Sequence, residues 1–326
     1  MRYIVGVDLG GSNIVVGTVR EDGGEIIGRS LRPTPANEGP DSVVATINEM
    51  INDSITETRD RKGGTVELAG VGIGSPGPVD TKNGIVLLAP NLGWRNFPLL
   101  HRIADATSLP ATLDNDANCA VLGEVWLGAA RNANIVIGVT VGTGIGGAVV
   151  IDGKPFRGAS DVAGEFGHMT IDSTGRRCKC GNYGCLEAYA SGPAIASRAI
   201  ESIRAGERSA VADYVDGDLS LITAETVYRA AGDGDILAVE VVRDTARFLG
   251  AGLANLLNAF NPDLVLVCGG VTKAGDSLFV PLRNEIKKRA FNPAVEACEI
   301  VPGELPELAG VYGAAASFRI QRGESL

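Results

Sequence analysis

No stretch of the 326-residue sequence is apolar for long enough to cross a lipid bilayer, which excludes a protein with helical membrane spans. There is also no block of lysine or arginine: 39 acidic side chains outweigh 29 basic ones, and the formal net charge is −10. Because such a surface repels phosphates, we expect neither nucleic acid nor a membrane as a partner. The start, MRYIVGVDLGG, lacks the features of a signal peptide, so we expect a cytoplasmic protein.

Histidine and aromatic residues are scarce, whereas glycine is abundant. The chain has two histidines and 5% aromatic residues against 44 glycines. At 45% hydrophobic and 21% charged residues, its composition is that of a globular protein, and its length predicts two domains. A cytoplasmic location keeps thiols reduced, which disfavours a disulfide framework for the six cysteines.

Two segments share the pattern of a strand, a glycine turn and a second strand. Residues 3–20 read YIVGVDLGGSNIVVGTVR and residues 135–151 read IVIGVTVGTGIGGAVVI. A β-hairpin that opens each half of the chain predicts a duplicated α/β architecture. Apolar periodicity further predicts a buried strand within 261–271. It predicts helices over 41–58, 191–207, 223–232 and 234–258, another that begins at about residue 116, and a last one near the C-terminus.

The second glycine turn, GTGIGG at 142–147, matches the G-x-G-x-x-G fingerprint of dinucleotide-binding proteins. That fingerprint needs a helix after the glycines, whereas AVVID predicts a strand here. No G-x-x-x-x-G-K-[ST] sequence occurs, so this is not a P-loop protein. Glycine turns can still present backbone N–H groups to phosphate oxygens. The paired turns therefore favour a nucleotide over two ordinary hairpins, with Asp8 placed to orient Mg²⁺ through water.

Three of the six cysteines lie in CKCGNYGC, and one of the two histidines precedes them. A disulfide staple, a redox pair, an iron–sulfur ligand set and a zinc site are the alternatives. A redox pair is usually spaced C-x-x-C, and a ferredoxin-type iron–sulfur cluster needs four thiolates, whereas the remaining cysteines lie far away in sequence. Cys₃His is a standard set for structural zinc. We therefore expect Zn²⁺ to be bound by His168, Cys178, Cys180 and Cys185.

The chain resembles the ROK family of sugar kinases from residue 4 to about residue 316. The motifs that carry the resemblance are DLGGSN (8–13), LDNDANCAVLGE (113–124), GVTVGTGIGGAVV (138–150), GEFGH (164–168) and CKCGNYGCLE (178–187). The resemblance implies an α/β protein with the two-domain actin-like fold of sugar kinases and Hsp70-like ATPases, including an interdomain cleft. It implies a small domain of residues 1–116 plus 308–326 and a large domain of residues 117–307.

The resemblance also implies ATP-dependent phosphorylation of a hexose. The position that matches Asp116 is the general base of the family, which accepts the hydroxyl proton during phosphoryl transfer. Local sequence alone also allows Asp116 to be a helix N-cap, and Asp114 is the nearest alternative base. The residues implied to bind the sugar are Asn91, Asn115, Asp116, Glu165, His168 and Glu187.

ATP and Mg²⁺ are the cofactors that the resemblance implies, in addition to structural Zn²⁺. The first turn reads DLGGSN where the family often has DLGGTK, so Asn13 supplies no cation, and Mg²⁺ could provide the missing charge. The adenosine is expected near Gly269 and Gly270. The residues implied to bind the nucleotide are Asp8, Gly10, Gly11, Ser12, Asn13, Gly142, Thr143, Gly144, Gly269 and Gly270.

The motif set most resembles the glucokinases of the family, so we expect glucose to be converted to glucose 6-phosphate. N-acetylhexosamine kinases and fructokinases share nearly all of these residues and remain alternatives. A sugar-responsive repressor would carry a helix-turn-helix domain before the first strand, which starts here at residue 3. A non-catalytic sugar sensor is disfavoured by Asp116, and a chaperone-like ATPase by the zinc motif. We expect a homodimer or homotetramer.

Overall fold

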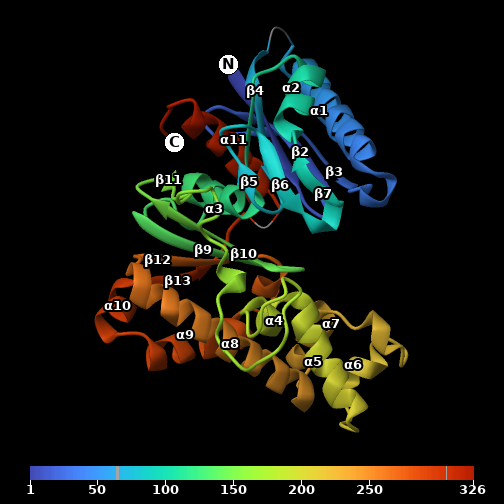
Figure 1. The fold of residues 1–326 in the computed structure, drawn as a ribbon, viewed down its shortest axis with the longest axis vertical. Helices are drawn as coiled ribbons and strands as arrows, with labels where there is room; N and C mark the ends of the chain where they lie inside the picture. The colour runs from blue at the N-terminus through green and yellow to red at the C-terminus, as the bar shows by residue number, and fades with distance from the viewer. Residues whose placement is uncertain (64–65, 306) are drawn as a thin grey trace. The chain divides into compact units, whose positions relative to one another are not determined.

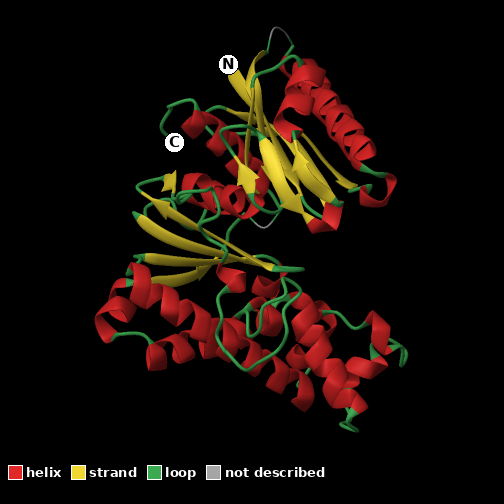
Figure 2. Ribbon diagram, in the orientation of Figure 1, coloured by secondary structure: helices red, strands yellow, loops and turns green. Residues whose placement is uncertain are grey.

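The computed structural model describes residues 1–63, 66–305 and 307–326. The chain forms two compact units. The first contains Met1–Asn134, Ala148–Ala163 and Glu304–Leu326, and the second contains Ile135–Gly147 and Gly164–Gly303. Both units combine helices with a sheet (Figure 2). Among the described residues, no helix combines the length and the apolar character needed to cross a membrane.

A five-stranded sheet with the order β3-β2-β1-β4-β8 is the centre of the first unit (Figure 1). Its strands are β1 (Arg2–Leu9), β2 (Asn13–Arg20), β3 (Ile26–Pro33), β4 (Glu67–Ser75) and β8 (Ala111–Asn115). β1 pairs antiparallel with β2 and parallel with β4, which in turn pairs parallel with β8. The predicted first hairpin is therefore confirmed.

Helices cover both faces of this sheet. They are α1 (Pro40–Lys62), α2 (Leu99–Thr107), α3 (Asp116–Leu127) and α11 (Ala309–Gln321). Because successive side chains of a strand point to opposite faces, β1 contributes to two cores. Val5 and Val7 pack in the core that includes α1 and α2, whereas Ile4 packs in the core that includes Phe318 of α11. A smaller antiparallel sheet consists of β5 (Val79–Asp80), β6 (Ile85–Ala89) and β7 (Trp94–Phe97).

Helices α3 and α11 approach each other with their backbones almost in contact. A Cβ atom at Gly313 would lie 1.5 Å from the carbonyl oxygen of Cys119, and one at Gly123 would lie 2.1 Å from that of Ala309. Only glycine fits at these two positions. This packing places α3 in the first unit, whereas the resemblance implied a large domain that begins at residue 117.

The second five-stranded sheet has the order β11-β10-β9-β12-β13. Its strands are β9 (Ile135–Val141), β10 (Ile145–Ile151), β11 (Lys154–Pro155), β12 (Leu264–Cys268) and β13 (Glu299–Pro302). β12 pairs in parallel with both β9 and β13, and the division between the two units passes through β10. The second predicted strand–glycine turn–strand segment is thus present as β9 and β10.

Helices make up most of the second unit (Figure 1). They are α4 (Glu187–Ala190), α5 (Gly192–Arg204), α6 (Ala210–Asp213), α7 (Ala224–Gly232), α8 (Ile236–Phe260), α9 (Asp276–Arg289) and α10 (Asn292–Ala297). The predicted helix over 234–258 begins and ends slightly later as α8. Its N-cap is Asp235, whose side chain accepts from the Ala238 N–H, and the left-handed residue Asn261 follows its last turn.

Candidate functional site

The first glycine turn joins β1 to β2 and is fixed by a backbone hydrogen bond and a hydrogen bond from a side chain. Gly10 N donates to the carbonyl oxygen of Asn13 at 2.8 Å, and Thr34 Oγ1 donates to that of Gly10 at 2.8 Å. Ser12 and Asn13 are exposed at its tip. Asp8 lies near the end of β1, where burial raises the pKa of its carboxyl group to about 6.

Asn91 lies against this turn. It belongs to the short 3₁₀ helix Pro90–Leu92, between β6 and β7. A Cβ atom at Gly11 would lie 3.1 Å from the Asn91 Cβ and 3.3 Å from its Nδ2. The structure therefore brings one of the residues implied to bind sugar next to a residue implied to bind phosphate, within the first unit.

The turn between β8 and α3 carries Asn115 and Asp116. The Asn115 Oδ1 accepts from the backbone N–H groups of Ala117 and Asn118 at 2.9 and 3.2 Å, so Asn115 is the N-cap of α3. Its Nδ2 donates to the carbonyl oxygen of Gly77 at 3.1 Å. Asp116 is the first residue of the helix, so the alternative that Asp116 is the N-cap is wrong.

Asp114 is fully buried, with an exposed fraction of 0%. Its carboxylate accepts from the side chains of Arg157 and Ser317 at 2.5 and 2.6 Å, and from Asn118 Nδ2 at 2.9 Å. A carboxylate enclosed by protein donors cannot reach a substrate hydroxyl. The structure therefore disfavours Asp114, the alternative base.

The second glycine turn is held from two sides. Gly142 N donates to the carbonyl oxygen of Gly144 at 2.9 Å across the turn, and Gly192 N, at the start of α5, donates to that of Gly142 at 2.8 Å. On the other side, Ile145 N donates to the Glu187 Oε2 at 2.9 Å. Glu187, which the resemblance implies to bind sugar, therefore also contacts the turn implied to bind phosphate.

The four predicted zinc ligands form one cluster in the second unit. Their ligand atoms all lie within 4.8 Å of one another. The Sγ atoms of Cys180 and Cys185 are 3.7 Å apart, and the Cys178 Sγ is 3.9 Å from the His168 Nδ1. Zinc–sulfur bonds of about 2.3 Å place the corners of a tetrahedron roughly 3.8 Å apart, so the cluster fits a tetrahedral zinc ion. Burial raises the pKa of the Cys185 thiol to about 12, so a metal ion would have to displace its proton.

Two acidic residues adjoin this cluster. His168 ends the short 3₁₀ helix Phe166–His168, and its Nε2 lies 3.9 Å from the Glu165 Oε2. Burial raises the pKa of Glu165, and the negative charge of Glu187 adds to this rise, whereas His168 opposes it. The Glu187 Oε1 lies 3.9 Å from the Cys178 Sγ. The structure thus brings together Glu165, His168 and Glu187, with the Nδ1 of His168 facing Cys178 and its Nε2 facing Glu165.

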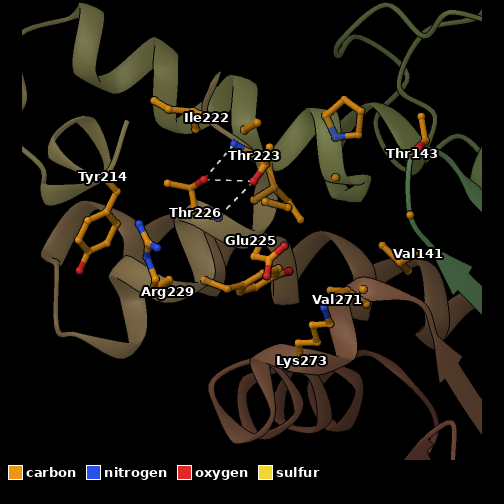
Figure 3. Close-up of a pocket in the computed structure, with 18 residues that line it drawn as sticks. Val141, Thr143, Tyr214, Ile222, Thr223, Glu225, Thr226, Arg229, Val271 and Lys273 are labelled. Atoms are coloured by element: carbon orange, nitrogen blue, oxygen red, sulfur yellow. Dashed lines mark hydrogen bonds between the residues drawn. The ribbon is translucent and has the colours of Figure 1, made fainter. Parts of the chain in front are cut away.

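A pocket of about 1030 Å³ lies within the second unit, between the second glycine turn and α7 (Figure 3). A volume of this order is typical of a cofactor site. Of the residues predicted to bind nucleotide, Gly142, Thr143 and Gly270 line it. Further lining residues are Val141, Gly192, Pro193, Ile195, Ala196, Tyr214, Ile222, Thr223, Ala224, Glu225, Thr226, Tyr228, Arg229, Val271 and Lys273.

Both apolar and polar groups line this pocket. The Arg229 guanidinium lies 4.0 Å from the centre of the Tyr214 ring, a cation–π contact, and Thr223 and Thr226 form a capping box at the start of α7 (Figure 3). Lys273 and Glu225 add charges of opposite sign. Sequence reasoning missed these side chains because they lie on helices and turns from separate parts of the chain, with no shared motif. The local sequence predicted the helices over 191–207 and 223–232, but not that their first residues line a pocket.

Comparison with known proteins assigns the family. The family model described as "ROK family" matches residues 4–320. The chain belongs to the ROK family. It is 37% identical to a protein named glucokinase from Halalkalibacterium halodurans, over 96% of this chain and 93% of that one. It is 33% identical to the xylose repressor of Caldicellulosiruptor bescii, over 96% of this chain and 77% of the repressor.

Solved structures support the same assignment. A ROK family glucokinase from Streptomyces griseus, determined in complex with glucose and AMPPNP, superimposes with a TM-score of 0.82 at 34% identity, covering 96% of this chain and 98% of that one. The predicted fold class is therefore confirmed: this ROK protein has the two-domain actin-like α/β fold of sugar kinases.

Proposed function

We propose that this ROK protein is a hexokinase-type kinase that transfers the terminal phosphoryl group of ATP to a hexose, with glucose preferred. The observation that carries the proposal is similarity over nearly the whole chain to proteins named glucokinase, one of them solved with glucose and AMPPNP. The site geometry agrees with it, since the chain has two glycine turns, a carboxylate at a helix start and a large pocket beside one turn.

Asp116 is the proposed general base. In phosphoryl transfer the protein positions the partners, offsets charge and accepts the proton of the attacking hydroxyl. The Asn115 cap fixes the start of α3, and the bond from its Nδ2 to Gly77 joins the loop between β4 and β5 to this turn. We assign the hexose hydroxyls to the residues that the resemblance implies, namely Asn91, Asn115, Asp116, Glu165, His168 and Glu187.

The pocket of the second unit is the proposed adenosine site. Its apolar side chains would pack on the base, and Gly142, Thr143 and Gly270 leave room for the ribose and the phosphates. Lys273, which lines the pocket and belongs to the same short 3₁₀ helix as Gly270 (Gly270–Ala274), brings a positive charge, whereas Asn13 brings none to the first turn. Bound Mg²⁺ would neutralise charge on the phosphates, and Asp8 is the carboxylate proposed to orient it through water.

A structural zinc ion is proposed for His168, Cys178, Cys180 and Cys185. Four protein ligands leave such an ion no open position, so it would stabilise this loop rather than activate water. In this role it holds the His168 ring with its Nε2 toward Glu165. The metal would thereby fix the orientation of groups that we assign to sugar binding.

Sugar-dependent ADP release tests the proposal. The purified protein is incubated with Mg·ATP and, in separate reactions, glucose, mannose, fructose, N-acetylglucosamine and N-acetylmannosamine. We expect the highest kcat/KM with glucose. A higher value with an acetylated hexosamine or with fructose would favour the corresponding alternative kinase. Sugar binding by calorimetry without stimulated ADP release would instead support a non-catalytic sugar-responsive protein, a class favoured by the similarity to xylose repressors.

A further inference from the structure

Asp114 connects the proposed base to a distant part of the sequence. Its Oδ1 accepts from Asn118 Nδ2 and from the backbone N–H of Asn115, both at 2.9 Å, and these bonds hold the turn that carries Asp116. Its Oδ2 accepts from the Arg157 Nη2 at 2.5 Å and from the Ser317 Oγ at 2.6 Å. The Asp114 side chain has an exposed fraction of 0% and that of Arg157 20%, so the pair is shielded from water.

A buried carboxylate of this kind depends on its cation. When one partner of a buried ion pair is removed, the other charge is left without an opposite charge nearby. The local structure then rearranges, or the remaining carboxylate takes up a proton. Without Arg157, the donors that the described residues still offer to Asp114 are neutral: Ser317, Asn118 and the Asn115 backbone. The bonds that fix the turn would then weaken first.

Arg157 also opposes a concentration of negative charge beside the base. Burial raises the pKa of the Cys119 thiol well above its ordinary value, and Asp114, Asp8 and Asp116 all raise it further, whereas Arg157 lowers it. Cys119 lies one turn after Asp116 on α3. Three carboxylates from β1, β8 and α3 therefore act on one region, and Arg157 is a cation that offsets them.

We propose that Arg157 is a positioning residue for phosphoryl transfer, which acts through Asp114 to hold the 113–118 turn and Asp116 in their active geometry. This inference rests on the proposed kinase function. Arg157 lies just after β11 in the segment Ala148–Ala163, which belongs to the same unit as Asp114. It therefore couples the geometry of the base to a segment that contributes no residue to the assigned sugar contacts.

The variants Arg157→Ala, Arg157→Gln and Arg157→Lys test this role. The matched control is Arg102→Ala, which removes another long-range ion pair of the first unit, 2.6 Å from Asp41, but one exposed to solvent. Hydrogen exchange is followed by mass spectrometry on the ligand-free protein. We expect the peptide that covers residues 113–119 to exchange about tenfold faster in Arg157→Ala and Arg157→Gln, and unchanged in the control.

Kinetics and binding supply the second readout. We expect kcat with glucose to fall about 10–100-fold in Arg157→Ala while the glucose Kd from calorimetry changes less than about threefold. Arg157→Lys, which keeps the charge, should recover most of the loss. If Arg157→Ala does not fold, Arg157→Gln carries the comparison.

Some results would overturn the inference. Unchanged exchange at 113–119, or a uniform increase across the first unit, would show that Arg157 has no specific hold on the turn. An equal loss of kcat in Arg102→Ala would show the same. Failure of the wild type to turn over any hexose would instead refute the proposed function, and the exchange experiment would still decide whether Arg157 anchors the turn.

Discussion

At the residue scale, the surroundings of each carboxylate determine whether it can act on a substrate. Asp114 and Asp116 are two positions apart, yet Asp114 is enclosed by donors whereas Asp116 begins a helix. Sequence alone could not separate them, because enclosure of Asp114 depends on Arg157 and Ser317, which lie far along the chain. Asn and Asp are both favoured at helix N-caps, so the local sequence predicted a cap here but did not show whether it is Asn115 or Asp116.

Replacing the proposed base tests its role directly. In Asp116→Asn the amide cannot accept the hydroxyl proton, so we expect kcat to fall at least about 10²-fold while glucose affinity stays within about tenfold. Steady-state ADP release and calorimetry measure the two effects. The control is Asp105→Asn, an exposed carboxylate on α2, which should behave as the wild type. Full turnover in Asp116→Asn would place the base elsewhere.

We expect the raised pKa of Asp8 to make the stability of the folded protein depend on pH. Burial raises its folded-state pKa from 3.8 to about 6, so the folded protein binds the proton more tightly than the unfolded chain between these pH values. The contribution of Asp8 to the free energy of unfolding therefore falls as pH rises from about 4 to about 6, and it stays constant above that range. Asp8→Asn, which carries no charge, should gain stability over the wild type on the order of 3 kcal/mol above pH 7 and almost nothing below pH 4.

Urea unfolding over a pH series without Mg²⁺ measures this difference. Asp22→Asn is the control of opposite sign. The hydrogen bond from Arg20 lowers the pKa of Asp22, so the charged Asp22 stabilises the folded wild type once pH has risen through the window just below 3.8. Asp22→Asn lacks this charge, so it should become less stable than the wild type as pH rises through the same window. A constant difference between Asp8→Asn and the wild type at every pH would rule out a raised pKa at Asp8.

At the element scale, the sequence predicted most helices and both hairpins because their signals are local. Helix α8 has an apolar stripe, an N-cap at Asp235 and a left-handed stop at Asn261. The signal for the cluster of His168 and three cysteines was also local, because the cysteines all lie within CKCGNYGC. The hydrogen bond from Ile145 to Glu187 was not predictable, since it joins a hairpin to a distant short helix.

Disruption of the zinc cluster should act on the whole loop. Cys180→Ser removes one thiolate, so we expect zinc content to fall from about one ion per chain toward zero and glucose affinity to weaken at least about tenfold. Elemental analysis and calorimetry measure these changes. Cys298→Ser, a partly buried cysteine outside the cluster, is the control and should retain zinc. Absence of zinc from the wild type would contradict the proposed metal.

At the scale of the whole molecule, the described pocket and the turn that carries Asp116 belong to different units. The described pocket is lined entirely by residues of the second unit, whereas Asp8, Asn91, Asn115 and Asp116 belong to the first. The sequence predicted two domains from its length and a duplicated α/β architecture from its repeated hairpins. It did not predict that α3 would join the first unit, because that depends on backbone contact between α3 and α11 at Gly313.

This distribution predicts that nucleotide binding can be blocked separately from sugar binding. Gly270 lines the pocket, and a Cβ atom built there meets no atom within 4 Å, so Gly270→Leu should fill the pocket without disturbing the fold. We expect the KM for ATP to rise at least about tenfold while the glucose Kd changes less than about threefold. Gly232→Ala, on α7 with equally open space, is the control. An unchanged KM in a folded Gly270→Leu variant would show that the nucleotide binds elsewhere, because a leucine side chain and an adenosine cannot occupy the same space.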